Sequence, residues 1–75
     1  MKKLVVKIAD CSGERLIRTA RHCGFGIVEG RKHCKIKTIK GDFVTTIPRH
    51  KRLKRELIRS VVTRFNEFGG NVELR

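Results

Sequence analysis

A histidine set among lysines is the part of this sequence best suited to chemistry. His33 follows Lys32, and Lys35 and Lys37 stand at alternate positions after it. An imidazole titrates close to neutral pH, so it can remove or donate a proton under conditions in which lysine stays charged. Beside a phosphodiester, such a group can take the proton of a ribose 2′-hydroxyl while nearby cations stabilise the charge that develops on the phosphoryl oxygens. These residues predict metal-independent chemistry on RNA, with His33 as general base or acid.

Each histidine also has a plainer interpretation. A single histidine at the start of a strand is more often a surface residue than a catalytic one, so the residue types alone leave both interpretations of His33 open. His50 precedes a predicted helix and is either a helix-entry residue or a phosphate ligand. We interpret His22, near the end of another predicted helix, as structural, because a cation there interacts favourably with the helix dipole.

The charge of the chain indicates an anionic partner. Its 75 residues include 19 Lys and Arg but only 7 Asp and Glu, which gives a formal net charge of +12. Such self-repulsion destabilises a small fold and is common where the partner is nucleic acid. A chain with no Trp or Tyr and 4 Phe has few aromatic side chains for stacking on bases, which favours contacts to phosphates. The predicted RNA-binding residues are Lys32, Lys35, Lys37, Arg49, His50, Arg52, Lys54 and Arg55.

Neither a metal nor another cofactor is expected. The potential ligands are Cys11, His22, Cys23, His33 and Cys34. They contain no CxxC or HxxxH pair, and adjacent residues on a strand point to opposite faces. An odd number of cysteines at apolar positions indicates reduced thiols in a cytoplasmic protein. The apolar run near the amino terminus is interrupted at Lys7 and Asp10, too early for a signal peptide or a membrane span, so no membrane partner is expected.

The hydrophobic pattern predicts one α+β domain, residues 1–75, that positions these side chains. Its core is a helix, three antiparallel strands and a second helix, with both helices on one face of the sheet. The predicted strands cover 25–29, 33–39 and 42–47, with a turn at 40–41; the helices begin near residue 13 and after Pro48, and end at Gly24 and Gly69. In the middle strand, alternation directs Cys34 and Ile36 toward the helices and His33 toward the open side. Short strands at 4–8 and 72–74 are expected side by side at a sheet edge.

Four short segments carry a resemblance to a known family. They are Ser12-Gly13-Glu14, Gly24-Phe25, Gly30-Arg31-Lys32-His33 and Ile47-Pro48-Arg49-His50. In their order and spacing, over about residues 12–68, they resemble the HicA-type toxins of bacterial and archaeal toxin–antitoxin systems. The resemblance implies a fold like that of double-stranded-RNA-binding domains, an mRNA-cleaving activity (an mRNA interferase) carried by His33, and neutralisation by a HicB-type antitoxin. Many members have serine or aspartate directly before the histidine, where this chain has Lys32.

Two other functions stay open at this point. The same fold could bind structured RNA by its shape and backbone without cleaving it. Alternatively, the positive charge could serve only an acidic, antitoxin-like protein partner. The segments 1–11 and 70–75 lie outside the family-like core. They could form either an extra edge pair or a self-association surface, so a homodimer stays open.

Overall fold

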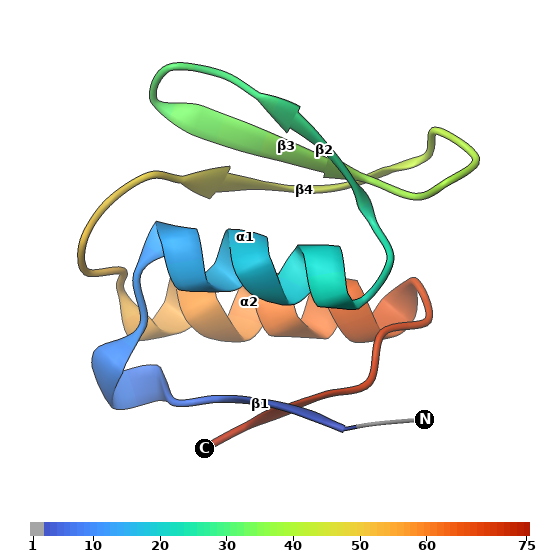
Figure 1. Ribbon diagram of the computed structural model, residues 1–75. Helices are drawn as coiled ribbons and strands as arrows, with labels where there is room; N and C mark the ends of the chain where they lie inside the picture. Colours follow the sequence, from blue (N-terminus) through green and yellow to red (C-terminus); the bar gives the residue numbers. More distant parts are fainter. Residues whose placement is uncertain (1–2) are drawn as a thin grey trace.

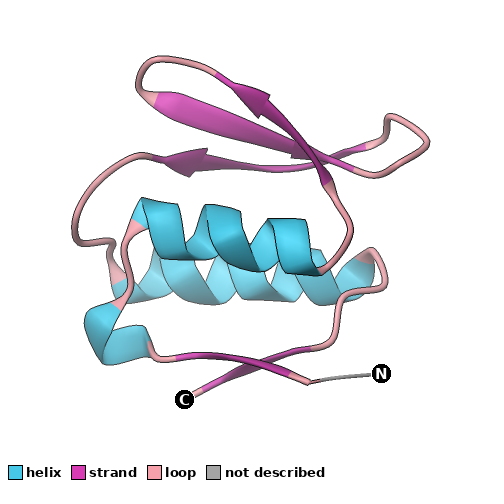
Figure 2. Ribbon diagram, in the orientation of Figure 1, coloured by secondary structure: helices cyan, strands magenta, loops and turns pink. Residues whose placement is uncertain are grey.

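Two helices lie between a three-stranded sheet and a separate pair of strands, so the molecule has three layers (Figure 1). The computed structural model describes residues 3–75; Met1 and Lys2, which belong to the predicted domain 1–75, lie outside the described residues. The elements in chain order are β1 (Leu4–Val6), the 3₁₀ turn η1 (Ile8–Asp10), α1 (Gly13–His22), β2 (Gly26–Glu29), β3 (His33–Lys37), β4 (Phe43–Pro48), α2 (Arg55–Glu67) and β5 (Val72–Leu74). Figure 2 shows helices, strands and loops in separate colours. The predicted α+β class is confirmed.

The three-stranded sheet has the topology that the sequence predicts. Strands β2, β3 and β4 are antiparallel and lie side by side in chain order. Cys34 of β3 pairs with Ile47 of β4, and both are fully buried, as is Ile36. Both helices cover the face on which these side chains lie (Figure 1). No other part of residues 3–75 covers the opposite face, so the apolar alternation of β3 decides which side of the sheet stays open.

Helix α1 begins and ends where its sequence signals stand. The Ser12 hydroxyl accepts a hydrogen bond from the Arg15 backbone N–H at 3.2 Å, which satisfies one of the unpaired donors of the first turn. Leu16, Ile17 and Ala20 are buried against the rest of the core. The last helical residue is His22, two positions before Gly24, so the predicted end of this helix is confirmed.

Helix α2 begins later than predicted. It starts at Arg55, and residues 49–54 form a loop where the sequence predicts the first turn of the helix. Leu53 is buried as its apolar character suggests, but its backbone N–H donates to the Cys11 carbonyl at 3.2 Å. This contact with a distant segment replaces the local bond that a helical turn would make, because a buried N–H must be paired somewhere. From Arg55 onward, Ile58, Val61 and Phe65 form the buried face.

The outer strands β1 and β5 pair with each other, as predicted, but away from the main sheet. They are parallel, with Leu4 opposite Val72 and Val6 opposite Leu74, and they form a two-stranded sheet of their own. Val6 and Val72 are buried beneath the helices, on the side opposite the main sheet (Figure 1). The predicted strand 4–8 is too long, since residues 8–10 form the turn η1 that leads into α1.

The β3–β4 hairpin is looser than a tight turn at residues 40–41. Strand β3 ends at Lys37, not at residue 39, and β4 starts at Phe43. Thr38 closes the loop, because its N–H donates to the Asp42 carbonyl at 2.8 Å and its hydroxyl accepts from the Asp42 N–H at 3.0 Å. Ile39 therefore lies at the tip, where its side chain is 89% exposed.

None of the helices in residues 3–75 has the length and apolar character needed to cross a membrane.

Candidate nucleic-acid interface

The open face of the main sheet carries His33. We use the name open face for the side chains of β2, β3 and β4 that lie opposite the helices: Val28, His33, Lys35, Lys37, Phe43, Thr46 and Pro48. His33 and Lys35 are exposed and Lys37 is half-buried, while Cys34 and Ile36 between them are fully buried. The predicted alternation of β3 is thus confirmed. An imidazole and two lysine side chains lie in one row that solvent can reach.

A tight turn fixes the backbone just before and at His33. The Gly30 N–H donates to the His33 carbonyl oxygen at 3.0 Å. A Cβ atom on residue 30 would lie 2.7 Å from that same oxygen, which is closer than real Cβ contacts come. Only glycine therefore fits at this position without moving the turn. Gly30, one of the residues that carry the family resemblance, has a structural reason to stand next to the candidate catalytic strand.

Arg49 holds the other side of this turn. Its backbone N–H donates to the Lys32 carbonyl at 3.0 Å, and its Nε donates to the Gly30 carbonyl at 3.2 Å. Its guanidinium reaches Glu14 (Nη1 to Oε1, 2.7 Å) and Glu29 (Nη2 to Oε1, 3.5 Å). The Arg49 side chain is 25% exposed, so this network is partly shielded from water. The turn before His33 is bound to α1 and to the end of β2 through one side chain.

The charge of Arg49 is secured by its neighbours. Removal from water lowers the pKa of this guanidinium, but the hydrogen bond and the negative charge of Glu14 more than compensate, and the net effect is a raised pKa. Arg49 therefore stays protonated, with its donors directed at carboxylates and a carbonyl. The sequence predicts Arg49 as a phosphate-binding residue; in the structure its hydrogen bonds go to the protein itself.

The loop after β4 packs directly on the start of α1. The Gly13 N–H donates to the His50 carbonyl at 2.9 Å, and a Cβ on residue 13 would lie only 2.0 Å from the Pro48 carbonyl oxygen. Three of the four segments that resemble the HicA family thus meet at one corner: the start of α1, the 30–33 turn and the Pro48-to-His50 segment. Residues far apart in the chain are brought together next to His33. The side chain of His50 is exposed.

A shallow depression of about 360 Å³ lies beside His33. Its lining residues are Val28, Glu29, Gly30, Arg31, His33 and Lys35. Glu29 is one of these lining residues, and its carboxylate is engaged by Arg21, at 3.2 Å, and by Arg49. His33 is the histidine of this depression, and Arg31 and Lys35 supply positive charge. Arg31 was not among the predicted binding residues. The signal that could have identified it is its position in the turn between two predicted strands, next to the predicted cations.

The remaining predicted phosphate contacts lie outside the open face. Lys32 is exposed in the turn before β3, Arg52 and Lys54 are exposed in the loop 49–54, and Arg55 is the first residue of α2. Figure 1 shows the start of β3, the end of β4 and the first turns of both helices at the same end of the molecule. The predicted RNA-binding residues thus form two groups in the structure. One is a row on the open face, and the other lies around the end of the molecule where β3 begins.

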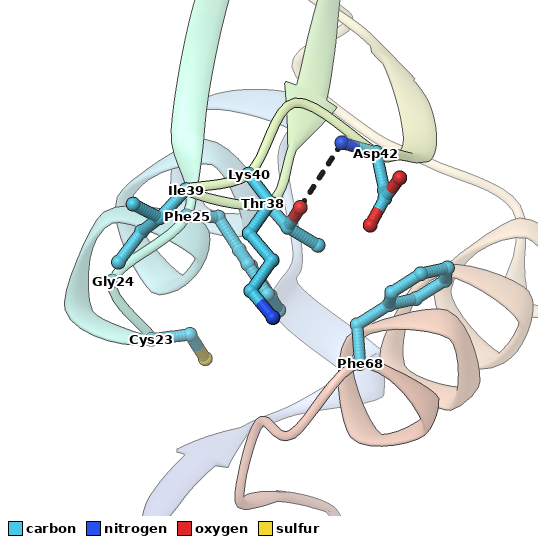
Figure 3. A pocket seen from close by; sticks show the side chains of 8 residues that line it. All are labelled: Cys23, Gly24, Phe25, Thr38, Ile39, Lys40, Asp42 and Phe68. Carbon is cyan, nitrogen blue, oxygen red and sulfur yellow. Dashed lines mark hydrogen bonds between the residues drawn. The ribbon is translucent and has the colours of Figure 1, made fainter.

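A second hollow lies at the other end of the main sheet and has no histidine among its lining residues. Its volume is about 320 Å³, and Figure 3 shows the lining residues Cys23, Gly24, Phe25, Thr38, Ile39, Lys40, Asp42 and Phe68. Burial raises the pKa of the Cys23 thiol more than a hydrogen bond to the Asn71 backbone lowers it, so this thiol stays protonated and weakly nucleophilic. No histidine lines this hollow, and its charged lining residues are Lys40 and Asp42.

Two further findings concern possible metal ligands and similarity to known proteins. Among the side chains that the structure describes, those of residues 3–9 and 11–75, no three of the His, Cys, Asp or Glu type are grouped closely enough to hold a metal ion. A scan of protein-family models, a search of curated proteins and a search of solved structures each returned no match for this chain.

Proposed function

We propose that this protein is a metal-independent endoribonuclease of the HicA type, with a fold like that of double-stranded-RNA-binding domains and His33 as its catalytic residue. The observation that carries the proposal is the position of His33. Its side chain is exposed on a sheet face that also carries Lys35 and Lys37, and its backbone is held by contacts to Gly30 and through Arg49. A fixed, accessible histidine beside cations is what cleavage through the ribose 2′-hydroxyl requires.

The reaction balances without a further reagent. His33 removes the proton of a 2′-hydroxyl, and the resulting oxygen attacks the adjacent phosphorus. The bond from phosphorus to the 5′-oxygen breaks, and that oxygen takes a proton from the imidazolium or from water. Lys35, exposed two residues further along β3, supports the negative charge of the phosphoryl oxygens. The products are an RNA end with a 2′,3′-cyclic phosphate and an RNA end with a 5′-hydroxyl.

The test is cleavage of a long single-stranded RNA in the presence of EDTA, at pH values on either side of neutrality. The parent protein is compared with His33→Ala and with His22→Ala. His22 is the matched control, because it is also an exposed histidine but lies at the last residue of α1, whereas the turn before His33 lies next to the first residues of that helix. We expect the parent and His22→Ala to cut the RNA and leave cyclic phosphates, and His33→Ala to lose at least about 100-fold in rate, a typical contribution of a general base.

Two results would contradict the proposal. Equal cleavage by the parent and His33→Ala would assign the activity to another group or to a contaminant. No cleavage by either, with RNA affinity retained in both, would make the protein a non-catalytic RNA-binding module of the same fold.

The proposal includes a HicB-type antitoxin as the protein partner and RNA, in particular mRNA, as the substrate. The charge of +12 supports an acidic partner as well as RNA. An inhibitory protein of this kind is expected to bind over the open face and stop cleavage. Addition of an acidic HicB-type protein that leaves cleavage unchanged would remove this part of the proposal.

A further inference from the structure

An exposed phenylalanine lies on the same face as His33. Large exposed apolar side chains in residues 3–75 are Val5, Val28, Ile39 and Phe43. Two of them, Val28 and Phe43, belong to the open face, and each is 50% exposed. Burial of an aromatic ring against a ligand is favourable, so the half-exposed ring of Phe43 offers an apolar contact surface on this face.

An irregularity in the sheet turns Phe43 outward. Lys37 pairs with Phe43, but the neighbouring Ile36 pairs with Thr45, so the register shifts by one residue and Val44 is the extra residue of β4. Val44 is fully buried, and Phe43 lies opposite Lys37 on the open face. A bulge of this kind redirects a side chain at a cost in regular pairing.

The neighbours of Phe43 on the open face are lysines, although the preceding residue along the chain is Asp42. Lys37 is its partner across the strands, where paired residues lie about 5 Å apart. Lys35 and His33 follow on the same row of β3, and His33 lies four residue steps from Lys37, about 13 Å along the strand. None of the seven open-face residues is acidic. The face therefore presents one aromatic ring, then cations, then the candidate catalytic histidine.

This order of groups fits an unpaired RNA strand. An aromatic ring offers a flat apolar surface for a base, and lysines along the same line can contact the phosphates of the following nucleotides. A base in a duplex is already stacked within the helix and cannot lie flat on a protein side chain. The chain has few aromatic residues, but the fold puts one of them where stacking would guide the strand to His33.

We infer that the open face binds single-stranded RNA, with a base stacked on Phe43 and the backbone running past Lys37 and Lys35 toward His33. This inference rests on the proposed function and specifies its substrate as unpaired RNA. It assigns to Phe43 a binding role that is separate from proton transfer.

The chain itself provides a clean optical test. It contains no Trp or Tyr, so Phe43→Trp introduces a single indole whose fluorescence can be read without background. The substitution is made together with His33→Ala, so that the RNA stays intact during titration with a short oligoadenylate or with a blunt RNA duplex of the same length. Val5→Trp, also with His33→Ala, is the matched control, because Val5 is 43% exposed but lies in β1, beyond the helices.

We expect oligoadenylate to quench the indole at position 43, the duplex to quench it much less, and neither to affect the indole at position 5. The companion measurement is affinity: Phe43→Ala should weaken oligoadenylate binding by roughly 5-fold to 100-fold, the usual effect of losing one stacked base. Phe43→Tyr, which keeps a ring, should restore most of the affinity, whereas a purely structural role would not require a ring.

Several outcomes would overturn the inference. They are an unchanged indole signal with oligoadenylate, equal quenching by the duplex, equal quenching at position 5, or unchanged RNA affinity in Phe43→Ala, as a protein-docking surface would give. Cleavage by the parent with a silent indole would reject the stacking role and leave the endoribonuclease in place. Quenching at position 43 without any cleavage by the parent would keep the stacking role and reject the endoribonuclease.

Discussion

Arg49 shows how one side chain can determine whether a site is ordered. Its donors connect the carbonyl of Gly30 with the carboxylates of Glu14 and Glu29, so the turn before His33, the start of α1 and the end of β2 depend on it. Loss of this side chain frees the turn and removes the ion pair with Glu14, while Glu29 keeps its ion pair with Arg21. We regard Arg49 as a positioning residue, which acts through His33.

We therefore predict that Arg49→Ala lowers RNA cleavage by about 100-fold, because a small displacement of a catalytic group has effects of that size. The KM for RNA should change much less than kcat, since the cations of the open face remain. Arg52→Ala is the comparison, because Arg52 is an exposed cation of the same loop that is predicted only as a phosphate contact; its loss should raise KM more than it lowers kcat. A variant that raises KM and keeps kcat would show that Arg49 acts as a phosphate ligand after all.

The Cys34 thiol gives a second prediction for a single residue. Burial raises its pKa, and this exceeds the opposing effect of the positive charge of Arg49. The reactive thiolate is therefore scarce in the folded protein at pH 8. We expect alkylation of Cys34 by iodoacetamide, followed by mass spectrometry of peptides, to be far slower in the native protein than in denaturant. Equal rates in both conditions would show that β3 opens readily at Cys34.

Among the elements, α1 and the loop after β4 approach each other so closely that a methyl group cannot fit. We predict that Gly13→Ala destabilises the protein by about 1–3 kcal/mol, the usual cost of an extra methyl group in a packed region, because the new Cβ would meet the Pro48 carbonyl. Gly26→Ala in β2 is the control, since its Cβ would make only an ordinary contact at 3.7 Å. Urea unfolding measures both. Equal stability of the two variants would mean that the loop moves aside freely.

The strand pair β1–β5 should respond to acid through Glu73. Hydrogen bonds from Lys3 and Arg75 lower the pKa of this carboxyl from its ordinary value of 4.5. Its contribution to stability is complete above the unfolded-state pKa and is lost as the pH falls through the lower folded-state pKa. We predict that the difference in unfolding free energy between the parent and Glu73→Gln is largest near neutral pH and shrinks below about pH 4.5. A difference that is independent of pH would contradict this.

The elements also show what sequence patterns can and cannot predict. Alternation in β3 correctly assigned Cys34 to the core and His33 to the open side, because that strand is regular. The same rule applied backward from Ile47 would put Phe43 in the core, yet the bulge at Val44 reverses it. The start of α2 was placed too early because the bond between Leu53 and Cys11 depends on tertiary contact, which no local pattern records.

The candidate site, like the fold, could be predicted from the sequence only where its residues belong to one regular strand. His33, Lys35 and Lys37 share a face because they share one strand, and the sequence was sufficient to show this. The pairing of Arg49 with Glu14 joins residues 35 positions apart, and only the packing of the loop on α1 brings them together. A basic residue at position 49 looked like a ligand for phosphate because its internal acidic partners could not be identified from the sequence.

For the molecule as a whole, the net charge of +12 should dominate its response to salt. Each phosphate contact to a single strand contributes about 0.7 to the slope of the logarithm of affinity against the logarithm of salt concentration. We predict that replacing both Lys35 and Lys37 by alanine lowers this slope by roughly 1.4, whereas replacing Lys3 and Lys7, near β1, leaves it almost unchanged. Fluorescence anisotropy of a labelled RNA over a salt series measures this. Equal slopes for all variants would indicate that RNA does not follow the open face.

The layered arrangement has a practical consequence for such measurements. Strands β1 and β5, which lead to the two chain ends, lie on the side of the helices opposite the main sheet (Figure 1). A tag or a flexible tether attached at either end would therefore emerge from the back of the molecule. Protein immobilised in this way on a sensor chip would present His33 and Phe43 to the flowing solution, so binding kinetics could be recorded without the support blocking the site.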